Sequence, residues 1–191
     1  MKRKQEEIMQ EYKKYFAYIQ RPGAKSLLDR MERNGFFSAP ASRKKHGNYP
    51  GGLAEHSVNV FKRLLRLTDE EEKRRQYDLE TIAICGLLHD LCKTDAYINI
   101  PAPEGDAEQY EHTRSFPAGH GEKSVIMILQ YMKLTKEEIL AIRWHMGAYD
   151  YDARGGGYNL DSAFGQSRLA VMLHLADMMA AHLDERKETE E

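Results

Sequence analysis

The residues best suited to chemistry in this sequence are histidines and aspartates that fall on the apolar faces of predicted helices. The adjacent pair His89-Asp90 is weak evidence by itself, because a chain of this composition has about an even chance of containing one. The apolar residues around such positions are more informative. At helical spacing, His56 aligns with Leu53, Val60 and Leu64, Asp90 with Ala83 and Gly86, His145 with Ile142, and Asp177 with Leu173 and Ala180. Four helices are therefore predicted to turn ionisable groups inward.

These inward polar groups need compensation, and a metal ion would provide it. A single inward histidine is explained well enough as a hydrogen-bonded core residue. Burying several imidazoles and two carboxylates without partners would cost several kcal/mol per group, more than the net stability of a typical domain can absorb. A divalent cation takes neutral imidazole nitrogens and carboxylate oxygens as ligands. The pattern as a whole therefore favours a metal centre between helices.

Helical periodicity dominates the chain, so the predicted fold class is all-α. With 191 residues, the chain is long enough for one domain with its own core. No segment shows the sustained alternation of a half-buried strand. We expect a single bundle of about six to seven helices, at residues 3–19, 24–34, 52–68, 78–92, 120–132, 136–146 and 165–183. Residues 1–45 are expected to form a helical extension packed on the core, 46–183 the main domain and 184–191 a charged tail that frays.

Two stretches between the predicted helices are longer than a compact domain usually needs, at residues 95–119 and 147–163. The first contains Arg114 among several aromatic and acidic residues, and the second carries Arg154 beside the run Gly155-Gly156-Gly157. Long loops often have functions, so both are expected to border the site. Surface hairpins without a role are the alternative.

Composition excludes several classes of protein. Hydrophobic residues make up 41% and charged residues 30%, and no run reaches the roughly 20 apolar residues that cross a bilayer. The N-terminal MKRKQEEIMQ has no apolar stretch of the kind a secretory signal contains, so a soluble, cytoplasmic protein is expected. The net charge of -2 gives no case for long nucleic acid, and the basic run before residue 45 is explained as a solvated helix face. Cys85 and Cys92, about 10 Å apart on one helix, are too distant for a disulfide.

Three segments resemble the successive motifs of a known family. GGLAEHS at 51–57, GLLHDLCK at 86–93 and LHLAD at 173–177 are similar to the signatures of HD-domain phosphohydrolases, a helical superfamily of metal-dependent enzymes. The resemblance covers about residues 46–183. It implies that one metal ion is bound by His56, His89, Asp90 and Asp177.

Two further histidines stand where binuclear members of this superfamily bind a second ion, His120 in GHGEKS and His145 in RWHMG. In such members the HD aspartate, here Asp90, bridges both ions and is central to catalysis. Lys93, at the position of the HDxxK lysine, is implied to contact a phosphate oxygen, with an exposed lysine near a helix end as the alternative. Two ions about 3.5 to 4 Å apart would activate a hydroxide and stabilise the charge that develops in line. The ligands do not distinguish Mn, Fe, Zn, Co and Ni.

The implied activity is hydrolysis of a phosphate ester by this hydroxide, and departures from known branches narrow the substrate. The cyclic-dinucleotide branch carries a GYP motif after its ligand histidines, whereas the similar tract here, residues 47–50, precedes the first. The alarmone hydrolases carry an acidic pair after HD, which HDLCKTD lacks. HGNYPGGLAEHS is similar to the HD domain of bacterial 3′-to-5′ exoribonucleases, but no OB-fold for gripping a strand is expected here.

A small phosphorylated substrate is therefore expected, either a nucleotide or a short oligonucleotide. Its phosphate is expected to contact Arg114, Arg143 and Arg154, although Arg143, two positions before His145 on a helix, points away from the ligand face.

Two rival functions stay open at this point. A few HD relatives use the same six ligands to hold two irons and oxidise inositol or a phosphonate with dioxygen, and the ligands do not separate the two chemistries. A catalytically silent HD fold that serves as a binding module is the other rival. Neither GxSxG nor a P-loop pattern occurs, so serine hydrolases and nucleotide kinases have no support. The sequence does not encode the oligomeric state.

Overall fold

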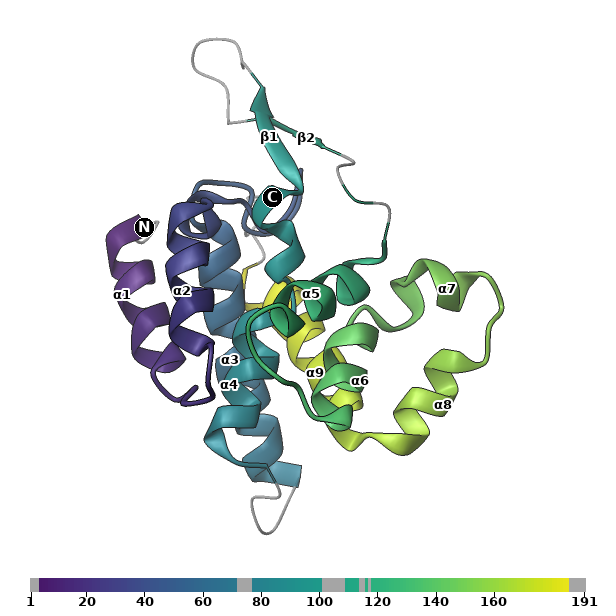
Figure 1. Ribbon diagram of the computed structural model, residues 1–191. Coiled ribbons are helices and arrows are strands. Elements are labelled where there is room, and N and C mark those ends of the chain that lie inside the picture. Colours follow the sequence, from purple (N-terminus) through teal and green to yellow (C-terminus); the bar gives the residue numbers. More distant parts are fainter. Residues whose placement is uncertain (1–3, 72–76, 101–108, 114–115, 117, 186–191) are drawn as a thin grey trace.

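The computed structural model of the chain describes residues 4–71, 77–100, 109–113, 116 and 118–185. Helices dominate these residues (Figure 1), which confirms the predicted all-α class. The helices of eight residues or more are α1 Gln5–Phe16, α2 Ala24–Arg33, α3 Gly52–Glu71, α4 Leu79–Leu88, α5 His120–Leu129, α6 Lys136–Trp144, α8 Asn159–Gln166 and α9 Arg168–Met179. Shorter segments are 3-10 helices at Phe36–Ser38, Leu91–Asp95 and Gly147–Tyr149, helix α7 at Tyr151–Arg154 and a π-helix at Ala180–Asp184.

One hydrophobic core joins the N-terminal helices to the rest of the chain. α1 packs against α3 and α4, where the buried Tyr12 hydroxyl donates to the carbonyl oxygen of Leu87 at 2.9 Å. α9 packs against both α3 and α6 (Figure 1). The four helices α3, α4, α6 and α9 thus surround the interior in which five of the six predicted ligands lie.

A glycine allows α3 and α4 to approach each other closely. A Cβ atom at Gly86 would lie 2.6 Å from the Cα of Phe61, well inside van der Waals contact. Gly86 precedes His89 by three residues, and Phe61 follows His56 by five. The close helix packing therefore brings the two histidine-bearing segments together.

A buried ion pair joins Arg21, which follows α1, to Glu138 of α6. Arg21 Nη1 lies 2.7 Å from Glu138 Oε2 and Nη2 lies 2.9 Å from Oε1, with the Glu138 side chain fully buried. Glu138 also completes the predicted capping box, because its backbone N–H donates to the Thr135 hydroxyl at 3.2 Å. Burial raises the pKa of the Glu138 carboxyl, but hydrogen bonds from Arg21 and Thr135 outweigh burial and lower the pKa below its ordinary value.

Several predicted helix boundaries are wrong. The helix expected at 78–92 ends at Leu88, because Asp90 (φ -106°, ψ 22°) leaves the helical conformation and a 3-10 helix follows. The helix expected at 165–183 is interrupted at Ser167 (φ -139°, ψ 108°), which separates α8 from α9 and caps α9 through its side chain.

Residues 95–119 contain a short antiparallel hairpin that the helical periodicity did not predict. β1 (Tyr97–Ile100) pairs antiparallel with β2 (Gln109–His112), with Tyr97 opposite His112. Each strand has four residues, and QYEH in β2 shows no apolar alternation, so a periodic signal could not reveal the pair. The second long stretch, 147–163, is also partly ordered, as Gly147–Tyr149, α7 and the start of α8.

The two cysteines are buried thiols outside any disulfide, as predicted. Burial raises the pKa of the Cys92 thiol to about 12. Within the described ranges, no helix combines the length and the apolar character that a membrane span requires.

Candidate metal centre

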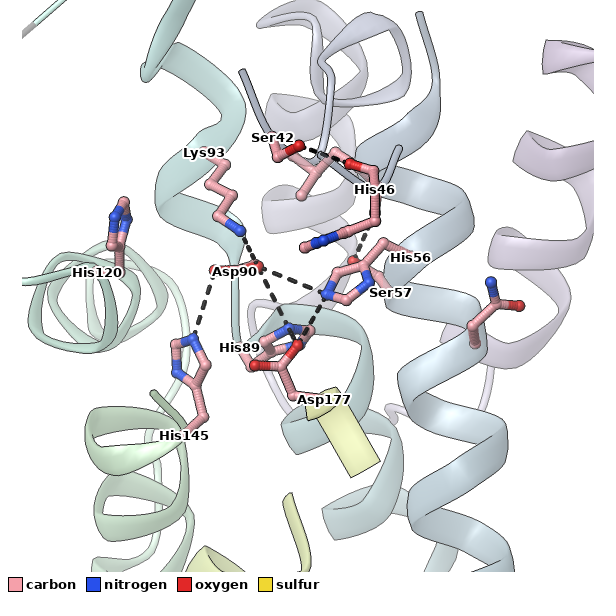
Figure 2. Close-up of polar contacts among 12 residues, drawn as sticks. Ser42, His46, His56, Ser57, His89, Asp90, Lys93, His120, His145 and Asp177 are labelled. Carbon is pink, nitrogen blue, oxygen red and sulfur yellow. Dashed lines mark hydrogen bonds and ion pairs between the residues drawn. The ribbon is translucent and has the colours of Figure 1, made fainter. Parts of the chain in front are cut away.

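Five of the predicted ligands converge in one interior site (Figure 2). They come from four helices: His56 from α3, His89 and Asp90 from the end of α4, His145 from the end of α6 and Asp177 from α9. The three imidazoles and Asp90 are at most 1% exposed. Ionisable groups are rarely buried so deeply unless they are paired or bind a metal.

Asp90 lies at the centre and turns its two carboxylate oxygens toward different partners. Oδ1 is 3.5 Å from His145 Nε2, while Oδ2 is 3.4 Å from His89 Nε2 and 3.8 Å from His56 Nε2. Asp177 Oδ1 lies 3.1 Å from His56 Nε2 and 4.0 Å from His89 Nε2. The ligand atoms thus form two adjoining groups, one of His56, His89 and Asp177 and one of His89, Asp90 and His145.

Backbone carbonyls orient two of the imidazoles. His89 Nδ1 lies 3.0 Å from the carbonyl oxygen of Gly86, and His145 Nδ1 lies 2.7 Å from that of Ile142. Both histidines directly follow the last residue of a helix. An Nδ1–H group that donates to the carbonyl leaves Nε2 as the ligand atom, with its lone pair directed into the site.

The donor set fits a transition metal ion. Among the described side chains, six buried polar atoms have no hydrogen-bond partner, and four of the six belong to this site: His56 Nε2, His89 Nε2, Asp90 Oδ1 and His145 Nε2. A buried polar atom without a partner costs about 1–3 kcal/mol. Imidazole nitrogens and carboxylate oxygens are the ligands of Zn, Fe, Mn, Co and Ni sites, so one or two such ions would satisfy all four atoms.

The local charge also favours a cation. Burial lowers the pKa of the His56 imidazole, but the carboxylates of Glu185 and Asp177 outweigh burial and raise this pKa to about 10. Burial raises the pKa of the Asp177 carboxyl, but its close contact with the His56 imidazole and the charges of His56 and His89 shift this pKa well below the ordinary value. The carboxylates therefore attract positive charge, and a metal ion can take the place of the proton on His56 Nε2.

Lys93 is part of the same site. Its Nζ atom lies 2.6 Å from Asp90 Oδ2, and the residue is 8% exposed. The alternative of an exposed lysine at a helix end is therefore wrong. Burial lowers the pKa of the Lys93 ammonium, but the charge of Asp90 outweighs it and raises the pKa above its ordinary value. Lys93 is thus a cation held against the predicted ligand Asp90.

His120 is the predicted ligand that does not join the others. It begins α5, and its Nδ1 lies 3.6 Å from the Sγ of Cys92. Within the described residues, no group of mutually close ligand atoms includes it. In Figure 2 it lies on the same side of Asp90 as His145. A second ion ligated by His120 therefore stays a prediction.

Arg143, predicted to contact phosphate, is surrounded by carboxylates. Its guanidinium pairs with Glu122 Oε1 at 2.9 Å, with Asp150 Oδ2 at 3.0 Å and with Asp152. It also lies 4.0 Å from the ring centroid of Trp144. These contacts connect α6 to α5 and α7, which indicates a structural role for Arg143. The geometry does not support the prediction that Arg143 contacts phosphate.

Of the other two predicted arginines, Arg114 lies outside the described residues. Arg154, at the end of α7, lies with its guanidinium 5.7 Å from the ring centroid of Tyr149. Tyr149 is 56% exposed, and both side chains line a cavity that reaches the predicted ligand Asp177.

That cavity has a volume of about 600 Å³ and reaches the cluster at Asp177. Its wall carries four cationic side chains, Lys44, Lys45, Lys93 and Arg154, beside Tyr149 and Met146. Pockets of a few hundred to a thousand Å³ hold small ligands. The cavity therefore gives a small anionic molecule access to the candidate metal centre.

Sequence reasoning missed His46 and Glu185. The Nδ1 of His56 lies 3.0 Å from Glu185 Oε1, and the ring centroids of His46 and His56 are 4.8 Å apart. Burial and the nearby His56 charge lower the pKa of His46 to about 4.

The prediction that the tail frays from residue 184 is wrong for Asp184 and Glu185. Asp184 pairs with Arg63, and Glu185 contacts His56. His46 stands in the HGNYPGG tract and could have been noticed there, whereas nothing in the sequence pattern singles out Glu185.

The chain belongs to the HD domain family, whose model matches residues 53–189. It is 36% identical over 75 residues to a dihydroneopterin 2′,3′-cyclic phosphate phosphodiesterase from Methanocaldococcus jannaschii. The match covers 38% of this chain and 29% of that relative's length. No solved structure matches the chain. HD domains bind divalent metal ions, and family membership with this partial match supports a metal-dependent phosphohydrolase in general terms.

Proposed function

We propose that this chain hydrolyses a small phosphate ester, with His56, His89, Asp90 and Asp177 binding a catalytic metal ion. The observation that carries the proposal is the convergence of four buried ligand atoms without a hydrogen-bond partner, those of His56, His89, Asp90 and His145, next to a cavity that reaches Asp177 and carries four cationic side chains. A bound cation would satisfy these buried nitrogen and oxygen atoms. The cationic side chains of the cavity would attract an anionic substrate. A bound divalent ion would supply Lewis acidity and lower the pKa of a water molecule.

The chain's own residues would hold the substrate phosphate. Lys93 is in place at the inner end of the cavity, because its pairing with Asp90 fixes the ammonium beside the ligands. Arg154, Lys44 and Lys45 line the outer wall and would bind further anionic oxygens of the substrate. Fixed cations of this kind position a phosphoryl group and stabilise the negative charge of the transition state.

A nucleotide or short oligonucleotide is the proposed substrate class. The cavity offers the half-exposed ring of Tyr149, with Arg154 against it, on which a flat heterocycle can stack. The phosphodiesterase from Methanocaldococcus jannaschii bears the name of a cyclic phosphate ester attached to a pterin, which is also a flat heterocycle. Both considerations favour a ring-bearing phosphomonoester or phosphodiester over a long nucleic acid.

A binuclear site is part of the proposal. Asp90 faces two adjoining groups of donors, and His145 lies on the side of Asp90 where His120 also lies. A second ion held between Asp90 and His145 would draw its remaining ligand from His120 through a change in the position of α5. Two ions sharing Asp90 would then clamp the attacking and the leaving oxygen.

The test is a panel of phosphate esters assayed with and without oxygen. Wild-type protein loaded with Mn²⁺, Fe²⁺ or Zn²⁺ would be offered nucleoside monophosphates, 2′,3′-cyclic nucleotides and short oligonucleotides. We expect release of phosphate or ring opening at the same rate in air and under argon. Product formation that consumes oxygen in equal amount would assign the chain to the oxygenases, and no turnover of any ester despite tight binding would assign it to the silent binding modules.

A further inference from the structure

The imidazole of His56 is held between two carboxylates from the same end of the chain. Asp177 Oδ1 lies 3.1 Å from Nε2, and Glu185 Oε1 lies 3.0 Å from Nδ1. Asp177 stands in α9, and Glu185 follows the π-helix Ala180–Asp184 that continues α9. One helical segment thus places a carboxylate at each nitrogen of this histidine.

Glu185 is fixed in place by a row of residues on α3. His56, Asn59 and Arg63 are spaced three and four residues apart, so they share one face of the helix. Asn59 Nδ2 donates to Glu185 Oε1 at 3.0 Å, and Arg63 pairs with both carboxylate oxygens of Asp184. The side chain of Glu185 is 6% exposed. This carboxylate is therefore buried, hydrogen-bonded and directed at His56.

The π-helix accounts for this placement. A π-helix adds a residue to the turn and changes the direction of the side chains that follow, and such turns are frequent at functional sites. Here it carries the chain from Met179 to Glu185 and ends beside α3.

His56 needs an orienting partner from outside its own helix. His89 and His145 follow the ends of their helices and use the carbonyl three residues earlier. His56 lies inside α3, and its corresponding carbonyl, that of Leu53, already accepts a hydrogen bond from the Ser57 hydroxyl at 2.9 Å. A side chain from another element must therefore accept the Nδ1 proton.

We propose that Glu185 is the positioning residue of the metal ligand His56: it accepts the Nδ1 proton, fixes the tautomer and directs the Nε2 lone pair at the metal. The proposal rests on the proposed function in that His56 binds metal. A carboxylate in this role also makes the imidazole a stronger donor, and loss of such a partner typically weakens metal binding 10–100-fold.

The competing roles for Glu185 are metal ligand and structural tether. The groups of mutually close ligand atoms include His46, His56 and Glu185. A metal bound to Nδ1 of His56 there would leave Nε2 as the protonated nitrogen that donates to Asp177, so His56 could also bind the proposed ion through Nε2 only if the imidazole lost both protons. The hydrogen bond needs no such ionisation. The neighbouring ion pair between Asp184 and Arg63 provides a control for the structural role. It joins the π-helix to α3, as Glu185 does, but has no contact with His56.

The experiment measures Zn²⁺ affinity of metal-free protein by competition with a chromophoric chelator. Wild type, Glu185→Ala, Glu185→Gln and Asp184→Asn would be compared, with thermal unfolding of each metal-free protein as the check on folding. We expect a 10–100-fold loss of affinity for Glu185→Ala, a smaller loss for Glu185→Gln, which keeps an acceptor, and a change within about twofold for Asp184→Asn. Zinc stoichiometry should stay at the wild-type value in all four proteins.

A second readout observes the hydrogen bond itself. In zinc-loaded protein, the Nδ1 proton of His56 should give a protected, low-field NMR resonance that disappears in Glu185→Ala and persists in Asp184→Asn. Unchanged zinc affinity in a folded Glu185→Ala protein would overturn the proposal, and loss of one zinc equivalent in Glu185→Gln would make Glu185 a ligand instead. If wild type binds no zinc at all, the proposed function fails and not this inference alone.

Discussion

Replacing Asp90 with alanine should destabilise the metal-free protein as well as remove a ligand. The Asp90 carboxylate lies 2.6 Å from Lys93 Nζ, and the two side chains are 1% and 10% exposed. Breaking a buried pair by removing one partner costs about 3–5 kcal/mol, because the other charge stays buried and uncompensated. Lys93 borders the cavity and can turn toward solvent. We therefore expect the lower end of this range, about 3 kcal/mol.

Urea unfolding of metal-free proteins, followed by circular dichroism, measures this cost. Asp95→Ala is the control, because Asp95 also pairs with a lysine, Lys123, but its side chain is 57% exposed, and such surface pairs contribute at most about 1 kcal/mol. Adding Lys93→Met to Asp90→Ala removes the stranded charge and should recover most of the lost stability. If Asp90→Ala unfolds within about 1 kcal/mol of wild type, Lys93 is not held as a buried cation and the description of the site is wrong.

Other predictions concern the second ion, the substrate contacts and the fold. His145→Ala and His120→Ala should each keep about one metal ion per chain while losing most of the rate of ester hydrolysis. The binuclear site would be refuted if wild type binds one metal ion per chain and His120→Ala binds the same amount. Arg154→Ala should raise KM for a phosphate ester without changing the unfolding midpoint. Arg143→Ala should lower the midpoint, because the Asp150 carboxylate, 3% exposed, loses its cationic partner; the opposite result for the two variants would exchange their roles. The pKa of the Glu138 carboxyl is lower in the folded state than in the unfolded state. The ionised carboxylate therefore stabilises the fold at neutral pH, and this stabilisation is lost as the pH falls through the folded-state pKa. Glu138→Gln should therefore cost stability in urea at pH 7, and this cost should shrink steadily as the pH is lowered below 4.5; a cost that does not change with pH would contradict this.

Part of the site could be predicted because two of the proposed ligands, His56 and Asp177, lie within regular helices. The apolar residues aligned with His56 and Asp177 already identified inward faces, and helix packing then brings inward faces together. His89 and Asp90 were predictable from the HD motif even though the helix ends at Leu88.

The remaining parts depend on irregular backbone, which periodicity does not describe. Glu185 reaches His56 only because a π-helix changes the direction of the chain after Met179. Lys44 and Lys45 line the cavity from a segment without a regular helix, so no helical face could assign them. His120 begins α5 and follows a segment whose two short strands, β1 and β2, helical periodicity did not predict.

The central claim is that a metal ion binds among His56, His89, Asp90 and Asp177. Anomalous diffraction from a crystal of metal-loaded protein, collected at the absorption edge of the metal, tests it most directly. The account predicts a peak about 2.0–2.2 Å from the Nε2 atoms of both histidines and from an oxygen of each aspartate. A fully loaded crystal with no peak there, or with its peak at His46 and Glu185, would contradict the account.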